Sequence, residues 1–427
     1  MLVNLAYDRG WLPLEAPPQA VVIEPRYSPP LPSPLAALRE ALAHPIGTKP
    51  LAEILKPWHK VTIVHCDGTR AMPNALVIAA LSEVLAAAGI PDSQITLLNA
   101  LGTHRRNTPE ELEALLGAEA IKRYRCEQAV AADTDAHVPV GQLPDNTPVK
   151  LHKCYVEADI RILLGFIEPH FFAGFSGGPK LIAPGISSLE TIFHLHSPAL
   201  VGHPKATWGI TAGNPLWETL RAVAALAPPT FIVNVALNRD KEVTAVFAGD
   251  LDQAHQAGIA YVRERSMCRV PHLFDIVVTT NSGFPLDQNL YQSVKGMSAA
   301  ARIVKPGGAI IIAAGCADGI PNHGAFFDIV REGGSPDGIL QVISRPGYHR
   351  CDQWQAQVLA LIRKKARILI YTAGVDEEAA RAMMLEPISD IGQAIDRLAK
   401  EMAGAVEKAS ICIMPEGPQT IPYVTEL

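Results

Sequence analysis

The sequence of 427 residues lacks the features that mark several large classes of protein. Its seven cysteines are scattered, odd in number and contain no C-x-x-C pair. This pattern argues against a disulfide framework and a cysteine-built zinc site, and it fits a reducing compartment. The formal net charge of −6 argues against a nucleic-acid-binding protein, which needs a clustered basic face.

Segments for export or membrane insertion are also missing. The first 15 residues do not have the basic-then-apolar plan of a signal peptide. The most apolar run, residues 75–90, is short and contains Glu83, so we expect a buried or amphipathic helix there. These absences predict a soluble, cytoplasmic protein that does not bind membranes.

Two common nucleotide-binding motifs are absent as well. No G-x-G-x-x-G fingerprint occurs, and the glycine-rich strand turn at residues 307–319 is too weak a signal to assign NAD. The stretch HFFAGFSGGPK, residues 170–180, is not a P-loop, because Pro179 separates the last glycine from Lys180. A conventional dehydrogenase is therefore disfavoured, and the purpose of Lys180 needs another explanation.

Strand-like and helix-like segments alternate along the chain. Apolar, β-rich runs at residues 60–67, 94–104 and 158–170 are followed by turns and then by helical patterns, one of which begins with Thr108 and Pro109. The pattern repeats after residue 270. This alternation predicts an α/β fold with mostly parallel sheets.

The length of the chain predicts two or three domains. Because the alternation restarts near residue 270, we expect two α/β domains with an active-site cleft between them. We expect residues 1–268 to form a cofactor-binding and catalytic domain, and residues 269–394 to form a domain that contributes substrate-binding residues. A return of residues 395–427 onto the first domain is left open.

Three predicted strands end at turns rich in polar side chains. These turns are DGTR at 67–70, GTHR at 102–105, and EPHFFAGFSGGPK at 168–180. In parallel sheets ligands bind beyond the carboxyl ends of the strands, so the three turns predict one shared site.

His104 and His170 occupy matched positions just after predicted strands. A lone histidine is most often a structural residue, but two imidazoles on opposite sides of a crevice could exchange protons at neutral pH. Such a pair is what inversion of a stereocentre requires, since one base must serve each face. His194 and His196 would share a face on a strand and diverge on a helix, which disfavours a two-histidine metal site from this pair. One of them as a single ligand, or packing at the surface or in the core, are the alternatives.

Two further groups have alternative interpretations. Arg70 fits a surface ion pair or a carboxylate-binding fork. Tyr291 and Lys295 lie one helical turn apart beside Gln292, which fits either an ordinary helix start or hydrogen-bonding groups for a small oxyacid.

Taken together, D-G-T-R at 67–70, G-T-H-R at 102–105, His170 with S-G-G-P-K up to Lys180, His196, and Y-Q-S-V-K at 291–295 resemble the lactate racemase family. The resemblance covers roughly residues 15–425, with the motifs in the family's order. One departure is that Ala71 and Met72 precede Pro73, where relatives commonly have proline directly after the arginine.

The resemblance implies a nickel-pincer nucleotide cofactor, a pyridinium mononucleotide that holds Ni(II). It implies that Lys180 tethers this cofactor covalently and contributes to the metal site, and that His196 is a nickel ligand. It also implies that the segment Asp67, Gly68, Thr69 and Arg70 contacts the nucleotide.

For catalysis, the resemblance implies that His104 and His170 are the paired acid and base. It implies substrate contacts from Arg70, Tyr291, Gln292, Lys295 and Trp354.

The implied reaction is racemisation or epimerisation at C2 of a 2-hydroxy acid through hydride transfer and a 2-keto acid intermediate. The hydrogen at C2 is barely acidic beside a carboxylate, so hydride transfer to an electron-poor cofactor is chemically reasonable. A sugar-acid 2-epimerase and a non-catalytic nucleotide carrier are the alternatives. The expected partners are a small 2-hydroxy acid and the proteins that make the cofactor, and homo-oligomerisation is left open.

Overall fold

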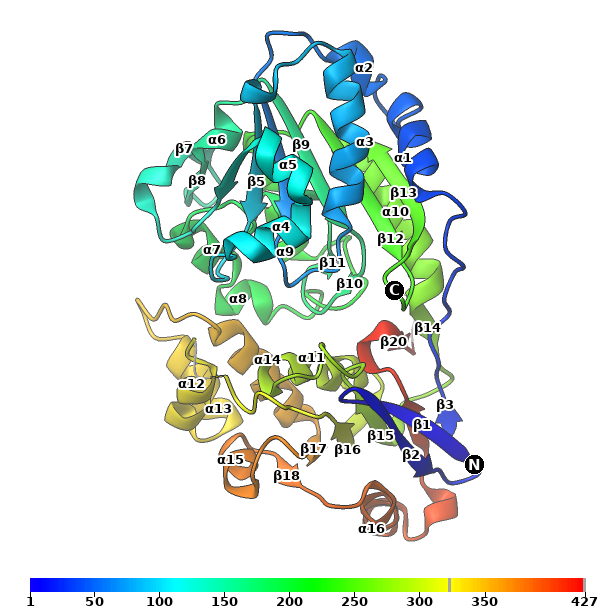
Figure 1. Cartoon of the computed structure of the whole chain (residues 1–427). Helices are drawn as coiled ribbons and strands as arrows, with labels where there is room; N and C mark the ends of the chain where they lie inside the picture. Colours follow the sequence, from blue (N-terminus) through cyan, green and yellow to red (C-terminus); the bar gives the residue numbers. More distant parts are fainter. Residues whose placement is uncertain (322–323, 425–427) are drawn as a thin grey trace. The chain divides into compact units, whose positions relative to one another are not determined.

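The computed structural model describes residues 1–321 and 324–424, and these form two compact units. Unit 1 comprises residues 1–26, 197–209 and the chain from residue 265 onward, and unit 2 comprises residues 27–196 and 210–264. Each unit is built around its own six-stranded, mostly parallel sheet, which confirms the predicted α/β class (Figure 1).

The sheet of unit 2 carries the three turns singled out in the sequence. Its strands follow the order β13 (Val243–Gly249), β12 (Phe231–Leu237), β9 (Ile160–Phe166), β4 (Val61–Cys66), β5 (Ile95–Ala100) and β6 (Arg125–Gln128). All neighbours are parallel except β12 and β13. β4 is buried along its whole length and β9 along all but one residue, which explains their nearly continuous apolar runs.

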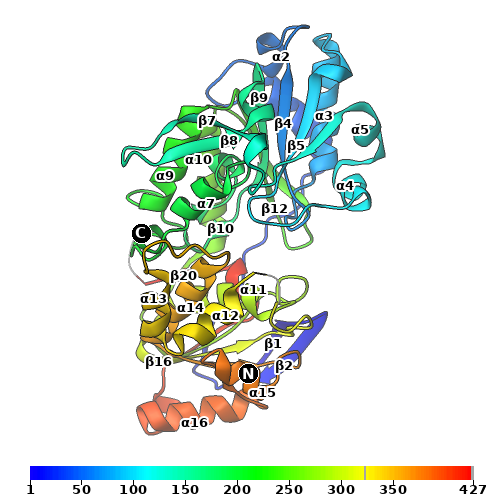
Figure 2. The ribbon, with the colours of Figure 1, turned by 90° about the vertical axis from the view of Figure 1, so that its left-hand side faces the viewer.

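Helices cover both faces of this sheet, with α3, α4 and α5 on one face and α9 and α10 on the other (Figure 2). Thr108 caps α4 by a reciprocal capping box with Glu111, as the Thr-Pro start predicts. The helices of unit 2 are α1 (Pro34–Ala43), α2 (Leu51–Ile54), α3 (Asn74–Ala87), α4 (Pro109–Leu116), α5 (Ala118–Arg123), α6 (Lys153–Val156), α7 (Leu189–Leu195), α9 (Pro215–Leu226) and α10 (Leu251–Ser266).

Short elements complete unit 2. The antiparallel pairs are β7 (His137–Gln142) with β8 (Pro148–His152), and β10 (Pro169–His170) with β11 (Gly174–Phe175). Three 3₁₀ turns are η1 (Asp92–Gln94), η2 (Thr134–Ala136) and η3 (Gly178–Leu181).

The sheet of unit 1 is parallel throughout. Its strands follow the order β18 (Glu386–Pro387), β17 (Arg367–Tyr371), β16 (Val304–Ala313), β15 (Phe274–Thr280), β19 (Ile411–Met414) and β3 (Val21–Val22). Two further pairs are the hairpin β1 (Leu2–Tyr7) with β2 (Gly10–Glu15), and the parallel pair β14 (Met267–Arg269) with β20 (Ile421–Tyr423).

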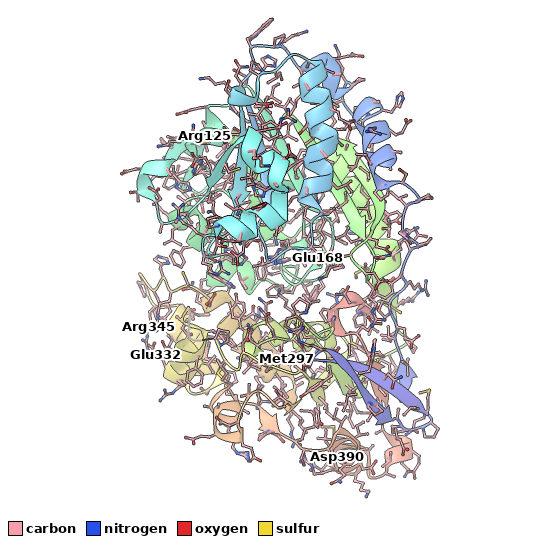
Figure 3. The ribbon with its side chains drawn as sticks, viewed as in Figure 1. Arg125, Glu168, Met297, Glu332, Arg345 and Asp390 are labelled. Atoms are coloured by element: carbon pink, nitrogen blue, oxygen red, sulfur yellow. The ribbon has the colours of Figure 1, made fainter. Side chains whose placement is uncertain are left out.

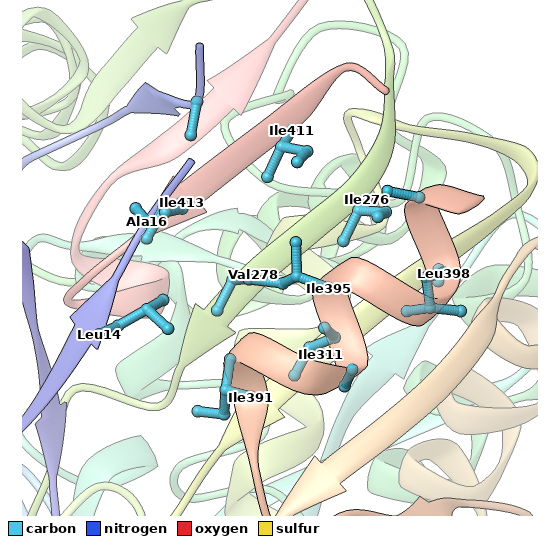
Figure 4. Packing of buried hydrophobic residues seen from close by; sticks show 14 of the residues in the cluster. Leu14, Ala16, Ile276, Val278, Ile311, Ile391, Ile395, Leu398, Ile411 and Ile413 are labelled. Atoms are coloured by element: carbon cyan, nitrogen blue, oxygen red, sulfur yellow. The ribbon is translucent and has the colours of Figure 1, made fainter. Parts of the chain in front are cut away.

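Unit 1 has helices α8 (Pro198–Val201), α11 (Leu290–Ala300), α12 (Phe326–Gly333), α13 (Pro336–Ile343), α14 (Gln353–Lys365), α15 (Glu377–Ala382) and α16 (Ile391–Ala403), with 3₁₀ turns η4 (Val406–Lys408) and η5 (Gly417–Gln419). α16 packs Ile391, Ile395 and Leu398 against the sheet, as Figure 4 shows. This spacing of about one helical turn places the three side chains on one face.

The division of the chain differs from the expected one. Residues 1–26 and 197–209 belong to unit 1, and residues from 395 onward also stay in unit 1, where β19 pairs with β15. The apolar run of β19 requires a buried sheet position but does not specify which sheet, because strand pairing between distant segments is a tertiary contact.

Candidate active site

The three polar turns of unit 2 follow neighbouring strands of its sheet. β4 pairs in parallel with β5 on one side and with β9 on the other, so their carboxyl ends are neighbours. Glu168, labelled in Figure 3, lies just beyond β9 in the third turn. The carboxyl ends of all three strands therefore lie at the same edge of the sheet, as a shared site would require.

Asp67 and His104 are in direct contact, although 37 positions separate them in the sequence. The Nδ1 atom of His104 lies 2.8 Å from Oδ2 of Asp67, and the hydroxyl of Thr69 donates to Oδ1 of the same carboxylate (2.8 Å). The Asp67 side chain is 5% exposed and that of His104 is 42% exposed. The buried carboxylate thus holds a solvent-accessible imidazole.

Electrostatics keeps Asp67 ionised despite its burial. Burial acts to raise the pKa of Asp67, but the hydrogen bonds from His104 and Thr69 and the positive charge of Arg70 outweigh this effect and lower it. Because a carboxylate can only accept, the shared proton is placed on Nδ1 of His104 and the lone pair on Nε2.

His170 has the opposite proton arrangement. It lies on β10, and its Nδ1 atom accepts hydrogen bonds from the backbone N–H groups of Phe172 (3.4 Å) and Ala173 (3.2 Å). An accepting Nδ1 places the proton of the neutral ring on Nε2. The rings of Phe171 and Phe172 lie 4.9 and 4.6 Å from the imidazole and fix its orientation.

The glycine turn before Lys180 is shaped by Asn234 of β12. The Oδ1 atom of Asn234, which is fully buried, accepts the N–H of Gly178 at 2.9 Å. A Cβ atom on Gly177 would lie 2.6 Å from the same oxygen, and Gly177 has a φ of +75°. Both the contact and the backbone conformation therefore require glycine at 177.

His255 of α10 holds the same turn from another element. Its Nε2 atom donates to the carbonyl of Ser176 (2.8 Å), and its ring stacks on Trp217 with centroids 5.4 Å apart. A Cβ atom on Gly178 would lie 2.4 Å from Nδ1 of His255. Burial lowers the pKa of His255 to about 4, so this residue is a neutral structural group at neutral pH.

His196 lies at the carboxyl end of α7 and is 8% exposed. Its Nδ1 atom donates to the carbonyl of Ile192 at 2.9 Å, which leaves the lone pair on Nε2. Burial lowers the pKa of His196 to about 4, and the charge of Lys180 acts in the same direction. The ring of His196 also lies 5.5 Å from that of Phe172, so His196 adjoins the turn that leads to Lys180.

His194 has a different role from His196. It is in the last turn of α7, where Nε2 lies 3.4 Å from Asp145 and Nδ1 lies 3.3 Å from the hydroxyl of Thr147. The helical backbone points the two histidines in different directions. His194 is a partly exposed ion-pairing residue, and only His196 is a candidate ligand of the two.

The candidate substrate residues of unit 1 lie on two helices. Tyr291, Gln292 and Lys295 are on α11, whose first turn is capped by Asn289 through the N–H of Gln292 (3.0 Å). Trp354 of α14 donates from Nε1 to the hydroxyl of Tyr291 at 3.3 Å. The structure thus brings Tyr291 and Trp354 together from positions 63 residues apart.

The sequence did not reveal several residues that support this site. Asn234 and His255 are distant from Lys180 along the chain, and the only local signal was the pair of glycines whose space they occupy. Gln128, which holds the His104 turn through the backbone of Asn107, was missed for the same reason, because it lies on another strand.

Within residues 1–321 and 324–424, no three histidine, cysteine or acidic side chains are grouped as a protein-only metal site would require. Over the same ranges, every helix is too short or too polar to cross a bilayer.

Known protein families match segments of this chain in both units. Residues 7–209 match the family described as the lactate racemase N-terminal domain, and residues 271–421 match the lactate racemase C-terminal domain. A protein named lactate racemase from Lactiplantibacillus plantarum is 35% identical over 382 residues, which are 89% of each chain. Another of the same name, from Thermoanaerobacterium thermosaccharolyticum, is 34% identical over 386 residues, 90% of this chain and 89% of the relative.

Solved structures give the same result. The lactate racemase apoprotein from Thermoanaerobacterium thermosaccharolyticum has a TM-score of 0.91 and 31% identity, and the match covers 99% of this chain and 100% of that one. A protein from Thermotoga maritima shares the fold with a TM-score of 0.70 and 21% identity, over 93% of this chain and 100% of that one. The chain therefore belongs to the lactate racemase family and is an enzyme of the isomerase class.

Proposed function

We propose that this chain racemises or epimerises a small 2-hydroxy acid at C2, with lactate as the first substrate to test. The names of its relatives support lactate. The proton arrangement of His104 and His170 supports inversion at a single carbon, because the two rings present complementary states at Nε2.

The complementary histidines are the observation that carries the proposal. Passage through a planar 2-keto acid requires one group that takes the hydroxyl proton and another that returns a proton on the opposite side. His104 has its lone pair on Nε2 and His170 has its proton there. In our proposal His104 takes the hydroxyl proton of one enantiomer, and His170 donates its proton to form the other. After this exchange His170 carries the lone pair and acts as the base for the reverse reaction.

Asp67 assists this exchange in a defined way. When His104 takes a proton it becomes a cation, and the ionised carboxylate 2.8 Å away stabilises it. Arg70 and Lys295 are the proposed cations for the substrate carboxylate. Tyr291, Gln292 and Trp354 are proposed substrate contacts, and the hydrogen bond between Tyr291 and Trp354 would fix the orientation of the phenol.

The residues present fit a nickel-pincer nucleotide. An imidazole with its lone pair on Nε2 is a suitable nickel ligand, and His196 has this form. His196 adjoins the turn that leads to Lys180, since its ring lies 5.5 Å from that of Phe172, and in our proposal one group is tethered at Lys180 and ligated by His196. The segment from Asp67 to Arg70 is the proposed nucleotide contact. When bound, the cofactor would supply the hydride acceptor that amino-acid side chains lack.

The cellular setting is part of the proposal. We propose that the protein acts in the cytoplasm and receives its cofactor from other proteins. Whether the substrate is lactate or a sugar acid depends on groups beyond C2, and a panel of 2-hydroxy acids would decide between them.

The test is expression with nickel and the cofactor-making proteins, followed by intact-mass measurement and chiral analysis of product. We expect a covalent adduct that is absent in Lys180→Ala, and racemisation that falls at least 1,000-fold in His104→Ala and His170→Ala, since each removes one of two required proton carriers. His194→Ala is the matched control and should retain activity. Wild-type turnover in either His104→Ala or His170→Ala would exclude the two-base assignment.

A further inference from the structure

A row of polar side chains crosses the carboxyl end of the unit 2 sheet. His65 of β4 is in register with Asn99 of β5, and Asn99 is in register with Gln128 of β6. The row two residues earlier is largely apolar, with Ile63 beside Leu97. Both His65 and Asn99 are fully buried. Polar groups in such a position need a specific purpose, because burial removes their hydrogen bonds to water.

Two members of this row bind Asn107, which lies in the turn that carries His104. The Gln128 side chain accepts the backbone N–H of Asn107 (2.8 Å) and donates to its carbonyl (3.1 Å). The Asn99 side chain donates to Oδ1 of Asn107 at 2.9 Å. Adjacent strands therefore hold both the backbone and the side chain of one loop residue.

The other side of Asn107 is tied to the start of α4. Its Nδ2 atom donates to Oε2 of Glu111 at 3.0 Å, and Glu111 also accepts two hydrogen bonds from Arg105 (2.7 and 2.9 Å). These bonds lower the pKa of Glu111, that from Arg105 most. Because Arg105 follows His104 directly, Glu111 holds the turn both at the residue after the histidine and at Asn107.

Asn107 also approaches the first polar turn. A Cβ atom on Gly68 would lie 3.1 Å from Nδ2 of Asn107, so the two turns are in close contact at that point. Gly68 follows Asp67, whose carboxylate holds His104. Asn107 therefore lies where the turn bearing the carboxylate meets the turn bearing the imidazole.

We propose that Asn107 and Gln128 are positioning residues for the acid-base chemistry of His104. The inference rests on the proposed function of His104 and extends it to groups that do not touch substrate. They set the separation of the two turns, so that the imidazole keeps its contact with Asp67 while its Nε2 atom exchanges a proton.

A purely stabilising role does not account for this row. Oδ1 of Asn99 and Nε2 of His65 are buried without a hydrogen-bond partner among the described residues, and each such group is destabilising. Apolar residues would fill the same sheet positions without that cost. The polar side chains of Asn99 and Gln128 are explained if their purpose is to hold the loop at Asn107.

The experiment compares three variants of the full chain. Gln128→Met removes both hydrogen bonds at nearly constant size, and Asn107→Ala removes the side-chain contacts of a loop residue with little risk to folding. Gln94→Met is the matched control. Gln94 directly precedes β5, the strand beside β6, at the opposite end of the sheet, and its side chain also makes two hydrogen bonds to backbone groups, the carbonyls of Pro57 and His59, at 3.0 Å each.

The first measurement does not require activity. Hydrogen exchange of the unmodified chain should be at least tenfold faster at residues 102–107 in Gln128→Met and Asn107→Ala, and unchanged there in Gln94→Met. Unchanged exchange at these residues in both test variants would overturn the proposal, whatever the reaction proves to be.

The second measurement uses the cofactor-loaded enzyme. We expect kcat to fall about tenfold to a hundredfold in both test variants, with KM changed less than threefold, because a misplaced base slows proton transfer without removing substrate contacts. An equal loss in Gln94→Met, or a rise in KM at unchanged kcat, would reject the positioning role. If the wild-type chain turned over no 2-hydroxy acid, the proposed function would fail, and the exchange measurement would still decide how the turn is held.

Discussion

At the scale of single residues, the chemistry of the site depends on which nitrogen of each histidine carries the proton. A carboxylate assigns it in His104, backbone N–H groups assign it in His170, and a backbone carbonyl assigns it in His196. Three imidazoles with similar intrinsic properties thereby acquire different roles. The sequence identified these histidines but not their protonation states, which depend on hydrogen-bond partners.

Asp67→Asn tests the carboxylate of this pair. The amide can still accept a hydrogen bond from His104, but it cannot stabilise the imidazolium that forms when His104 takes a proton. We expect kcat to fall about a hundredfold with a small change in stability, measured by chiral assay and chemical denaturation. Thr69→Val, which removes only the hydroxyl bonded to Asp67, should have the smaller effect on kcat; an equal loss would contradict this explanation.

At the scale of elements, side chains from β12 and α10 determine the conformation of the glycine turn before Lys180. Gly177 and Gly178 both have positive φ, and the side chains of Asn234 and His255 fill the space where a Cβ atom would lie. The turn therefore places Lys180 in η3 without the flexibility that two glycines suggest.

Gly178→Ala should destabilise the chain more than Gly347→Ala. Both glycines have positive φ, of +49° and +75°, but a Cβ atom at 178 meets His255 at 2.4 Å whereas none of the described atoms lies within 4 Å at 347. We expect an additional loss of about 1–3 kcal/mol from overpacking at 178, measured by chemical denaturation. Gly178→Ala combined with His255→Ala should show less than the sum of the single effects. If the two losses in the free energy of unfolding were strictly additive, the clash between residue 178 and His255 would be excluded as their cause.

At the scale of the whole molecule, buried neutral histidines make stability depend on pH. Burial lowers the pKa of His65 and of His255 to about 4, against a usual value of 6.5. Between these two values the unfolded chain binds protons that the folded chain does not, so the free energy of unfolding falls as the pH decreases from 6.5 to 4.

Chemical denaturation at pH 7.5 and pH 4.5 measures this dependence. Each histidine contributes a loss of about 2–3 kcal/mol at about 1.4 kcal/mol per pKa unit. His255→Gln should reduce the loss in the free energy of unfolding between pH 7.5 and pH 4.5 by the contribution of one histidine. Replacement of the exposed His44 is the control and should leave this loss unchanged. A pH dependence that persisted in full after His255→Gln would contradict this assignment.

The sequence by itself determined the local features of this protein. The Thr108-Pro109 start of α4, the apolar runs of β4, β5 and β9, and the polar turns that follow them depend on neighbouring residues and on the periodicity of burial. Because parallel strands bring their carboxyl ends to one edge, the grouping of three polar turns was predictable as well.

Only the tertiary structure decided the rest. It placed residues 1–26 and the chain from 395 onward in the same unit, paired Asp67 with His104, and brought Asn234 and Gln128 to turns distant from them in sequence. These contacts depend on which strands become neighbours and on where helices pack. An apolar run does not specify which other strand it pairs with. Local patterns thus predicted candidate site residues, and long-range packing determined the hydrogen-bond partners of each.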